Sequence, residues 1–126
     1  MSSPTEATYV VWRFTDGKAG HDAQSRGLIR ALAARHPLAV HEIDVRNIGA
    51  ALIDLLRGRF AAGRGLMDPD LIIGAGRATH LPMVAARRAR GGRIVVLMRP
   101  SLPAALFDLV VAPAHDGLVE GRRTIV

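Results

Sequence analysis

Residues 9–21 have the sequence YVVWRFTDGKAGH, and residues 71–80 have the sequence LIIGAGRATH. Each stretch begins with β-branched, aromatic or large aliphatic residues, which are typical of a strand, and continues into a turn that contains two glycines. A helical pattern of apolar residues follows each turn, so both stretches have the order strand, loop, helix. Repetition of this order along a chain predicts a parallel sheet with right-handed crossovers.

The rest of the chain extends this pattern. Further strands are predicted at residues 38–45, 94–98, 109–111 and 123–126, and the 38–45 strand alternates in a way that indicates weaker burial. Helices are predicted after the first glycine loop up to His36-Pro37, then over residues 48–62 and 79–90, the last of them closed by Gly91-Gly92. We therefore expect an α/β fold over residues 1–126: a single Rossmann-like domain whose open parallel sheet of about five to six strands has helices on both faces.

The glycine loops indicate where a ligand would bind. If the strand order is 2-1-3-4-5, the topological switch lies between the first and third strands, and both loops face one crevice. Glycine lets a backbone approach an anion closely, and a following helix offers unpaired N–H groups. The candidate ligand-binding residues are Gly17, Lys18, Gly20, Ser25, Gly74, Gly76, Arg77, Thr79, His80, Arg99 and Ser101. Asp16 and His21 are the candidate catalytic carboxylate and base.

A plainer interpretation stays open beside this one, in which the glycines serve only tight turns and Thr79 caps the third helix. The loop at residues 16–21 lacks the Gly-Lys-Ser/Thr ending of a P-loop and the three spaced glycines of a dinucleotide fingerprint, which disfavours ATP and NAD. The chain has no cysteine and no pair of histidines four residues apart with a carboxylate. We expect neither a cofactor nor a metal site.

Composition restricts the class of protein. The net charge is +6, from 17 basic and 11 acidic residues, and every basic residue except Lys18 is arginine. Such a charge attracts polyanions or anionic lipid surfaces, although an arginine-rich coding bias would give the same count. Five aromatic residues and no recognisable motif disfavour specific nucleic-acid binding. A polar start, no cysteine and no apolar stretch of about 20 residues predict a cytoplasmic protein, with peripheral attachment at the inner membrane as a further option.

Three segments, at residues 12–25, 70–82 and 96–116, together resemble the amino-terminal half of the mitochondrial-fission "elongated mitochondria" family and its bacterial members. The motifs are Thr-Asp-Gly-Lys-x-Gly-His, Ile-Gly-Ala-Gly-Arg-x-Thr-His and Met-Arg-Pro-Ser-Leu-Pro. That family is in turn similar to GT-B glycosyltransferases, particularly the enzyme that adds N-acetylglucosamine to a lipid-linked muramyl peptide.

The resemblance implies an acceptor-binding Rossmann-like half, paired with a C-terminal half that binds a nucleotide-sugar donor. Gly17, Gly20 and His21 match the glycine loop of the glycosyltransferases, whereas Lys18 departs from it by replacing a small residue. The loop on the neighbouring strand is matched by Gly74, Gly76, Thr79 and His80. The implied ligand is a phosphorylated or lipid-diphosphate molecule, and the isolated chain is expected to be inactive as an enzyme.

A non-enzymatic alternative makes the chain a scaffold or binding domain at a membrane surface. The basic group Arg87, Arg88 and Arg90 and the apolar helix within residues 48–62 would then carry the function. A solvated face at a helix end and a buried crossover helix are the ordinary explanations of these two features. A chain that ends on an apolar strand is also expected to be part of a longer protein.

Overall fold

The computed structural model describes residues 8–47, 51–97, 109–111 and 124–125. Six parallel strands form one sheet in the order β2-β1-β3-β4-β5-β6. The strands are β1 (Tyr9–Thr15), β2 (Leu38–Asp44), β3 (Leu71–Ala75), β4 (Arg93–Leu97), β5 (Leu109–Val111) and β6 (Thr124–Ile125). This confirms the α/β class and the predicted order, with β6 added beside β5.

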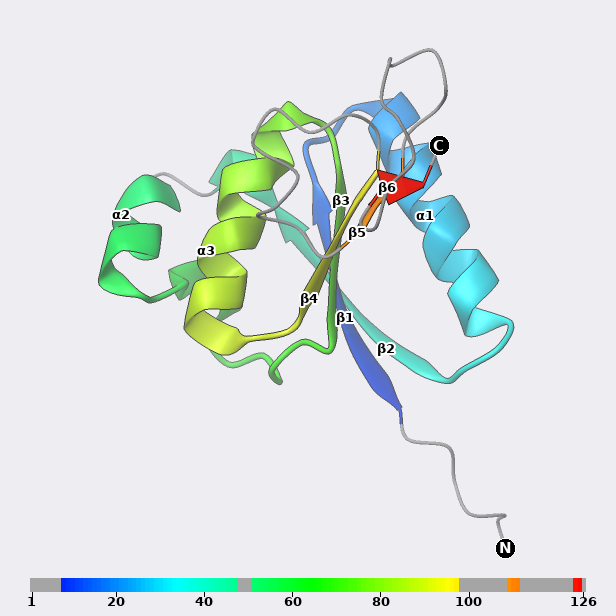
Figure 1. Ribbon diagram of the computed structural model, residues 1–126, viewed down its shortest axis with the longest axis horizontal. Coiled ribbons are helices and arrows are strands. Elements are labelled where there is room, and N and C mark those ends of the chain that lie inside the picture. The colour runs from blue at the N-terminus through cyan, green and yellow to red at the C-terminus, as the bar shows by residue number, and fades with distance from the viewer. Residues whose placement is uncertain (1–7, 48–50, 98–108, 112–123, 126) are drawn as a thin grey trace, which may run out of the picture.

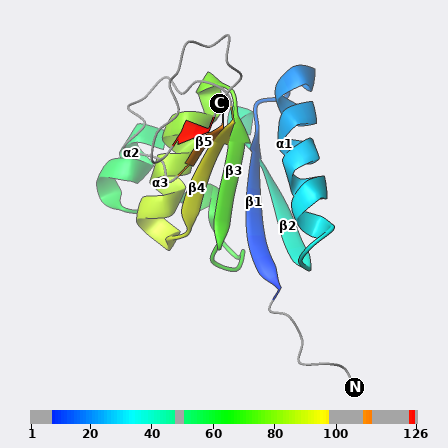
Figure 2. The same ribbon diagram turned by 45° about the vertical axis from the view of Figure 1, so that its right-hand side comes forward.

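Helices cover both faces of the sheet, as Figures 1 and 2 show. The α-helices are α1 (Ala19–Ala33), α2 (Ala51–Arg57) and α3 (His80–Arg90), and the short 3₁₀ turns are η1 (Val45–Asn47), η2 (Ala61–Gly63) and η3 (Arg77–Thr79). The chain moves one way across the sheet from β1 to β2 and the other way from β2 to β3 and β4. Right-handed crossovers therefore place α1 on one face and α2 and α3 on the other.

The larger core lies between the sheet and the α2–α3 layer. Trp12 is fully buried there and stacks on Phe60 at 5.9 Å between ring centroids. Its indole N–H donates to the carbonyl of Met67, and the Arg90 guanidinium lies 5.2 Å from its ring. A smaller core on the other face packs α1 onto β1, β3 and β4 through Val11, Ile73, Ala75, Leu97, Leu28, Ile29 and Leu32. These two cores fix the helix ends that approach the carboxyl edge of the sheet.

The second predicted helix was too long. Instead of running over residues 48–62, α2 ends at Arg57, and Gly58 follows in the left-handed region with φ +65°. The side chain of Asp54 accepts hydrogen bonds from Arg59 and from the N–H of Ala61, so the chain turns there rather than continuing as a helix. At Gly63, an added Cβ would lie 2.5 Å from the Trp12 ring, and this packing closes η2.

Both ends of α3 were predicted to within one residue, but the capping role of Thr79 was not. Gly91 has φ +81° and donates its N–H to the carbonyl of Arg87, which ends the helix. Thr79 precedes His80 without making a side-chain cap. Its hydroxyl donates instead to the carbonyl of Gly76 at 2.7 Å. The predicted N-cap role of Thr79 is therefore wrong, because the η3 turn brings a carbonyl within reach of that hydroxyl.

Candidate functional site

A carboxylate and an imidazole meet at the carboxyl end of β1. Asp16 follows the strand directly, and its Oδ2 lies 2.7 Å from Nδ1 of His21 in the first turn of α1. The other carboxylate oxygen accepts the N–H of Lys18 at 3.0 Å. The Asp16 side chain is 4% exposed and that of His21 is 24% exposed. With Nδ1 toward the carboxylate, Nε2 is the ring nitrogen left for a ligand.

Asp16 is held as an anion. Burial alone would raise the pKa of this carboxyl, but the N–H of Lys18, the ring of His21 and the charges of both residues lower it by more. The pKa therefore lies below its ordinary value, and the group is ionised at neutral pH. An ionised carboxylate orients the imidazole and stabilises the positive charge that develops when Nε2 takes up a proton.

Gly76 brings the second glycine loop against this pair. Its φ is +100°, and an added Cβ would lie 2.4 Å from Nδ1 of His21 and 2.5 Å from Oδ2 of Asp16. No side chain fits in that space, so only glycine lets the end of β3 approach the end of β1 so closely. The predicted meeting of the two glycine loops at one edge of the sheet is confirmed.

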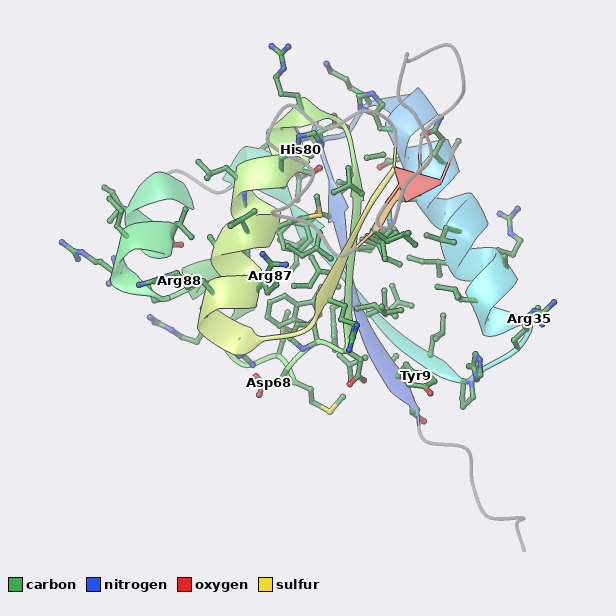
Figure 3. All side chains as sticks on the ribbon, in the orientation of Figure 1. Tyr9, Arg35, Asp68, His80, Arg87 and Arg88 are labelled. Carbon is green, nitrogen blue, oxygen red and sulfur yellow. The ribbon has the colours of Figure 1, made fainter. Side chains whose placement is uncertain are left out.

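Three of the candidate residues in the second loop are buried and do not face solvent. A Cβ on Gly74 would lie 2.7 Å from Sδ of Met83, so this glycine serves the packing of α3. Thr79 is fully buried. His80, labelled at the carboxyl edge in Figure 3, is 2% exposed; burial lowers its pKa, and the charges of Arg77 and His21 lower it further. His80 is therefore a neutral, buried neighbour of the pair.

The exposed candidates are Gly17, Lys18, Gly20 and Arg77. Neither the Lys18 nor the Arg77 side chain has a hydrogen-bond or ion-pair partner among the residues that the structure describes. Gly20 has open space around it, with nothing within 4 Å of an added Cβ. The remaining candidates Arg99 and Ser101 lie outside the described residues.

Ser25 lies apart from this group, on the buried face of α1. It is 1% exposed, and its hydroxyl accepts a hydrogen bond from the buried Arg13 at 2.9 Å. Arg13 also donates to Asp22 at 3.1 Å and to Glu42 at 2.7 Å. This network joins the second turn of α1 to β1 and β2, and so fixes the direction in which α1 presents His21. We therefore leave Ser25 out of the ligand-binding set.

Sequence reasoning missed Arg46, which lies two residues beyond β2. Its Nε and Nη2 both bond to Asp44, at 3.0 Å and 2.7 Å for the shorter contact of each. An added Cβ on Gly17, where φ is +80°, would lie 2.7 Å from the Arg46 guanidinium carbon. The guanidinium therefore lies across the first glycine loop. The available signal was the Asp-x-Arg triplet directly after the second strand.

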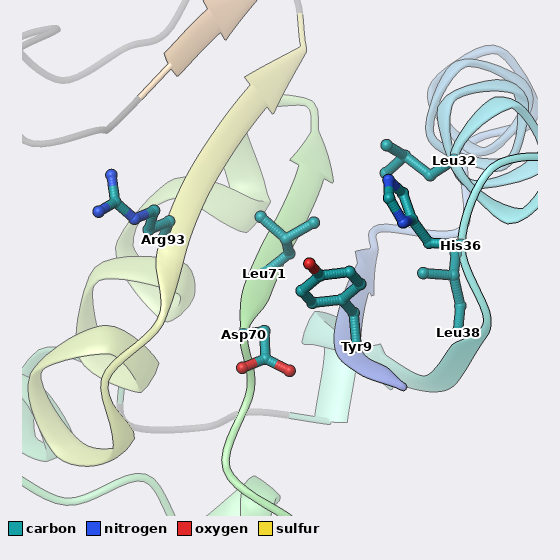
Figure 4. Close-up of a pocket in the computed structure, with 7 residues that line it drawn as sticks. All are labelled: Tyr9, Leu32, His36, Leu38, Asp70, Leu71 and Arg93. Atoms are coloured by element: carbon teal, nitrogen blue, oxygen red, sulfur yellow. The ribbon is translucent and has the colours of Figure 1, made fainter. Parts of the chain in front are cut away.

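A pocket of about 410 Å³ lies at the opposite edge of the sheet, where the strands begin (Figure 4). It is lined by Tyr9, Leu32, His36, Leu38, Asp70, Leu71 and Arg93. Tyr9 and His36 meet there edge to face, at 5.3 Å between ring centroids. None of the candidate residues lies in this pocket, so the Asp16–His21 site is a separate, open surface at the carboxyl edge.

Two kinds of feature are absent from the described residues. No group of three His, Asp or Glu side chains in that part of the chain lies close enough together to hold a metal ion. None of its helices has both the length and the apolarity needed to cross a membrane. The groups present at the site are one imidazole bonded to a carboxylate, exposed cations and the N–H groups at the start of α1.

Comparison with known proteins places the chain in a family. An uncharacterized protein of Rickettsia prowazekii (strain Madrid E) is 27% identical over an alignment of 116 residues, and the match covers 84% of this chain and 32% of the relative. The chain thus spans about a third of the length of that curated relative. No solved structure matches this chain. The sequence model of the family described as mitochondrial fission ELM1 matches residues 19–126. The chain therefore belongs to the mitochondrial fission ELM1 family.

Proposed function

We propose that the carboxyl edge of the sheet binds a phosphate-bearing ligand and that His21, backed by Asp16, accepts a proton from a hydroxyl of that ligand. The observation that carries the proposal is the 2.7 Å contact between Asp16 and Nδ1 of His21, closed over by Gly76. A buried carboxylate bonded to one nitrogen of a partly exposed imidazole is the arrangement that general bases use.

The surroundings of the pair support an anionic ligand. Lys18 and Arg77 are exposed on the two loops that meet at His21. The first N–H groups of α1 have no carbonyl partner inside the helix, and the positive end of the helix dipole lies at the same place. Cations and free N–H groups around one base suit a phosphate that is held while a neighbouring hydroxyl reacts.

The reaction class that fits is glycosyl transfer to a hydroxyl, with this chain as the acceptor-side domain of a GT-B-like enzyme. The support is the resemblance of the glycine loop to those glycosyltransferases, together with the Asp16–His21 pair at the end of β1. The donor, a nucleotide sugar, would be bound by a second domain. We therefore expect this chain alone to bind the acceptor and to transfer no sugar.

Isothermal titration calorimetry with inorganic pyrophosphate tests the anion site. The wild-type chain is expected to bind, and Lys18→Ala to bind several-fold more weakly, because a charged hydrogen-bond donor is lost. Arg35→Ala is the matched control, since it also removes one exposed cation, at the far end of α1 in Figure 3. Equal affinities of Lys18→Ala and wild type would contradict the assigned role of the first loop.

A second function, attachment to an anionic membrane surface, is favoured by one observation on α2. Leu56 is 71% exposed and Ile53 is 48% exposed on this helix, and the Arg88 side chain lies 3.6 Å from a Cβ placed on Gly58 just beyond it. Two exposed apolar side chains next to arginines suit an acidic lipid interface. Arg90 contributes little to such a surface, because it is bonded to Asp68 and to the carbonyls of Gly63 and Leu66.

Vesicle sedimentation separates the two functions. If α2 attaches the chain, wild type and Lys18→Ala will co-sediment equally with phosphatidylglycerol vesicles. The Ile53→Ser, Leu56→Ser double variant will stay in the supernatant. Neutral phosphatidylcholine vesicles are the control for charge. No sedimentation of the wild-type chain with anionic vesicles would exclude this second function.

A further inference from the structure

We infer that Arg46 is a specificity-determining residue of the site and that it selects ligands with two adjacent phosphoryl groups, as in a diphosphate ester. This inference rests on the proposed function, because it assigns a ligand class to the same edge of the sheet. Arg46 is not part of either glycine loop, and it reaches the site from the neighbouring strand β2.

Three adjacent strands each end in one cation. Arg46 lies two residues beyond β2, Lys18 three residues beyond β1, and Arg77 two residues beyond β3. The strand order is β2-β1-β3, so Lys18 and the Asp16–His21 pair are in the middle and the two arginines flank them. Neighbouring strands are about 4.8 Å apart, which makes the row roughly 10 Å wide at the backbone. A single phosphate reaches one or two members of such a row, whereas a diphosphate can reach all three.

Arg46 is oriented before any ligand binds. Nε and Nη2 face Asp44, and the backbone N–H of Arg46 bonds to the same carboxylate at 2.9 Å. This fork directs Nη1 toward the first loop, 2.7 Å from the position of a Gly17 Cβ. The Nη1 donors thus lie above the glycine turn, while the side chain as a whole remains 66% exposed. A guanidinium can bind a carboxylate on one edge and a phosphate on another, because its five N–H groups point outward in one plane.

The nearby carboxylates do not oppose an anion as strongly as their number suggests. Asp44 is bonded to Arg46, Asp22 to Arg13 and Thr15, and Asp16 to His21 and the N–H of Lys18. Each carboxylate is therefore turned toward an internal donor. What remains for an anion is the exposed Lys18 and Arg77 side chains, which are unpaired among the described residues, and the Nη1 edge of Arg46.

The experiment compares inorganic pyrophosphate with inorganic orthophosphate, by calorimetry on wild type, Arg46→Ala, Arg46→Lys and the control Arg35→Ala. Wild type is expected to prefer pyrophosphate. Arg46→Ala should weaken the binding of pyrophosphate about fivefold to tenfold and the binding of orthophosphate much less, so the preference for pyrophosphate falls. Arg46→Lys keeps the charge but loses the forked N–H groups, so its affinity for pyrophosphate is expected to be close to that of Arg46→Ala. Arg35→Ala should bind like wild type.

Several results would overturn the inference, and they are distinguishable. If wild type binds neither anion, the proposed anion site fails and this inference fails with it. If wild type binds pyrophosphate and Arg46→Ala binds it equally, only the role of Arg46 is lost. Equal losses in Arg46→Ala and Arg35→Ala, or full binding by Arg46→Lys, would show that net charge alone matters. Thermal unfolding of each variant checks folding, and Arg46→Lys still gives an answer if Arg46→Ala does not fold.

The source of the diphosphate is a separate arm of the same experiment. Farnesyl diphosphate below its micellar concentration and uridine diphosphate carry the same group on an isoprenyl chain and on a nucleoside. A gain in affinity over pyrophosphate for the isoprenyl compound, lowered by Arg46→Ala, supports a lipid-linked ligand of this class. The same gain for the nucleotide supports a free diphosphate ester. Absence of any Arg46 dependence with both compounds would overturn the inference.

Discussion

Replacing Gly76 by alanine should destabilise the protein strongly, because this glycine is where the two loops meet. At φ +100° and ψ 149° the backbone is in a region that residues with a Cβ rarely adopt, which costs about 1–3 kcal/mol. The added Cβ would also lie 2.4 Å from Nδ1 of His21 and 2.5 Å from Oδ2 of Asp16. Displacing those atoms costs about another 1–3 kcal/mol.

The expected loss is therefore about 2–6 kcal/mol of the free energy of unfolding. For a chain of 126 residues, an unfolding entropy of about 2.1 cal/mol/K per residue converts each kcal/mol into roughly 4 °C. Thermal denaturation followed by circular dichroism should show the midpoint of Gly76→Ala lowered by roughly 8–24 °C.

Gly20→Ala is the matched control for this substitution. Gly20 lies in α1, and nothing lies within 4 Å of an added Cβ. Alanine in a helix is favoured over glycine by about 0.5–1 kcal/mol, so this variant should unfold at the wild-type temperature or a few degrees above it. If Gly76→Ala unfolded at the same temperature as Gly20→Ala, the close approach of the loops to the Asp16–His21 pair would be refuted.

Three further predictions concern buried polar groups. The pKa values of Asp16 and Asp22 are lowered in the folded protein, so the stability that they contribute is present above about pH 4 and is lost as pH falls through the folded values. Asp22→Asn should therefore make the free energy of unfolding, measured by urea denaturation from pH 5 to 2.5, depend less on pH than in wild type. An unchanged pH dependence would contradict this. The pKa of His80 is lowered by burial in the folded protein, so the unfolded chain takes up the proton first and stability should fall as pH drops through the pKa of the unfolded chain. An NMR titration should find the midpoint of this ring below the ordinary value of about 6.5, and a midpoint at or above that value would contradict the burial of the ring. Arg13→Met leaves three acceptors without their donor, two of them reachable by water, and should cost about 2–3 kcal/mol in urea denaturation, whereas a loss below about 0.5 kcal/mol would show that the network is dispensable.

The sheet could be predicted from the sequence because strand patterns and crossover rules are both local or nearly so. Apolar runs such as residues 71–75 identify strands, and the reversal of direction after β2 follows from right-handed connections. The meeting of the Gly17 and Gly76 loops is a consequence of that order. Strand order thus predicted which loops would be neighbours without any knowledge of their side chains.

Side-chain roles at the ends of helices were harder to predict. Thr79 has the residue type of a cap, yet its hydroxyl reaches the carbonyl of Gly76 because η3 curls the chain first. Ser25 has the type of a phosphate ligand, yet it lies on the face of α1 that covers the buried Arg13. Both outcomes depend on which way a helix is rotated on the sheet. The single charged residue inside the apolar β1 run was the signal that something polar had to lie above it.

The early end of α2 and the position of Arg46 depend on contacts between distant segments. Gly58 ends α2 in a left-handed conformation, which the apolar pattern of residues 48–62 conceals. The orientation of Arg46 is set by its bonds to Asp44. Its guanidinium lies against Gly17, which is 29 residues earlier in the chain but at the end of the adjacent strand. A pattern within one segment carries no information about such a neighbour.

The most direct test of the central claim is an NMR chemical-shift titration of the wild-type chain with inorganic pyrophosphate, recorded on the backbone amides. The proposed site predicts shifts that saturate together at Gly17, Lys18, Gly20, Gly76 and Arg77, with the amides around the Tyr9 and His36 pocket unchanged. A well-dispersed spectrum with no shift at either glycine loop, or with shifts only at the opposite edge of the sheet, would contradict the account.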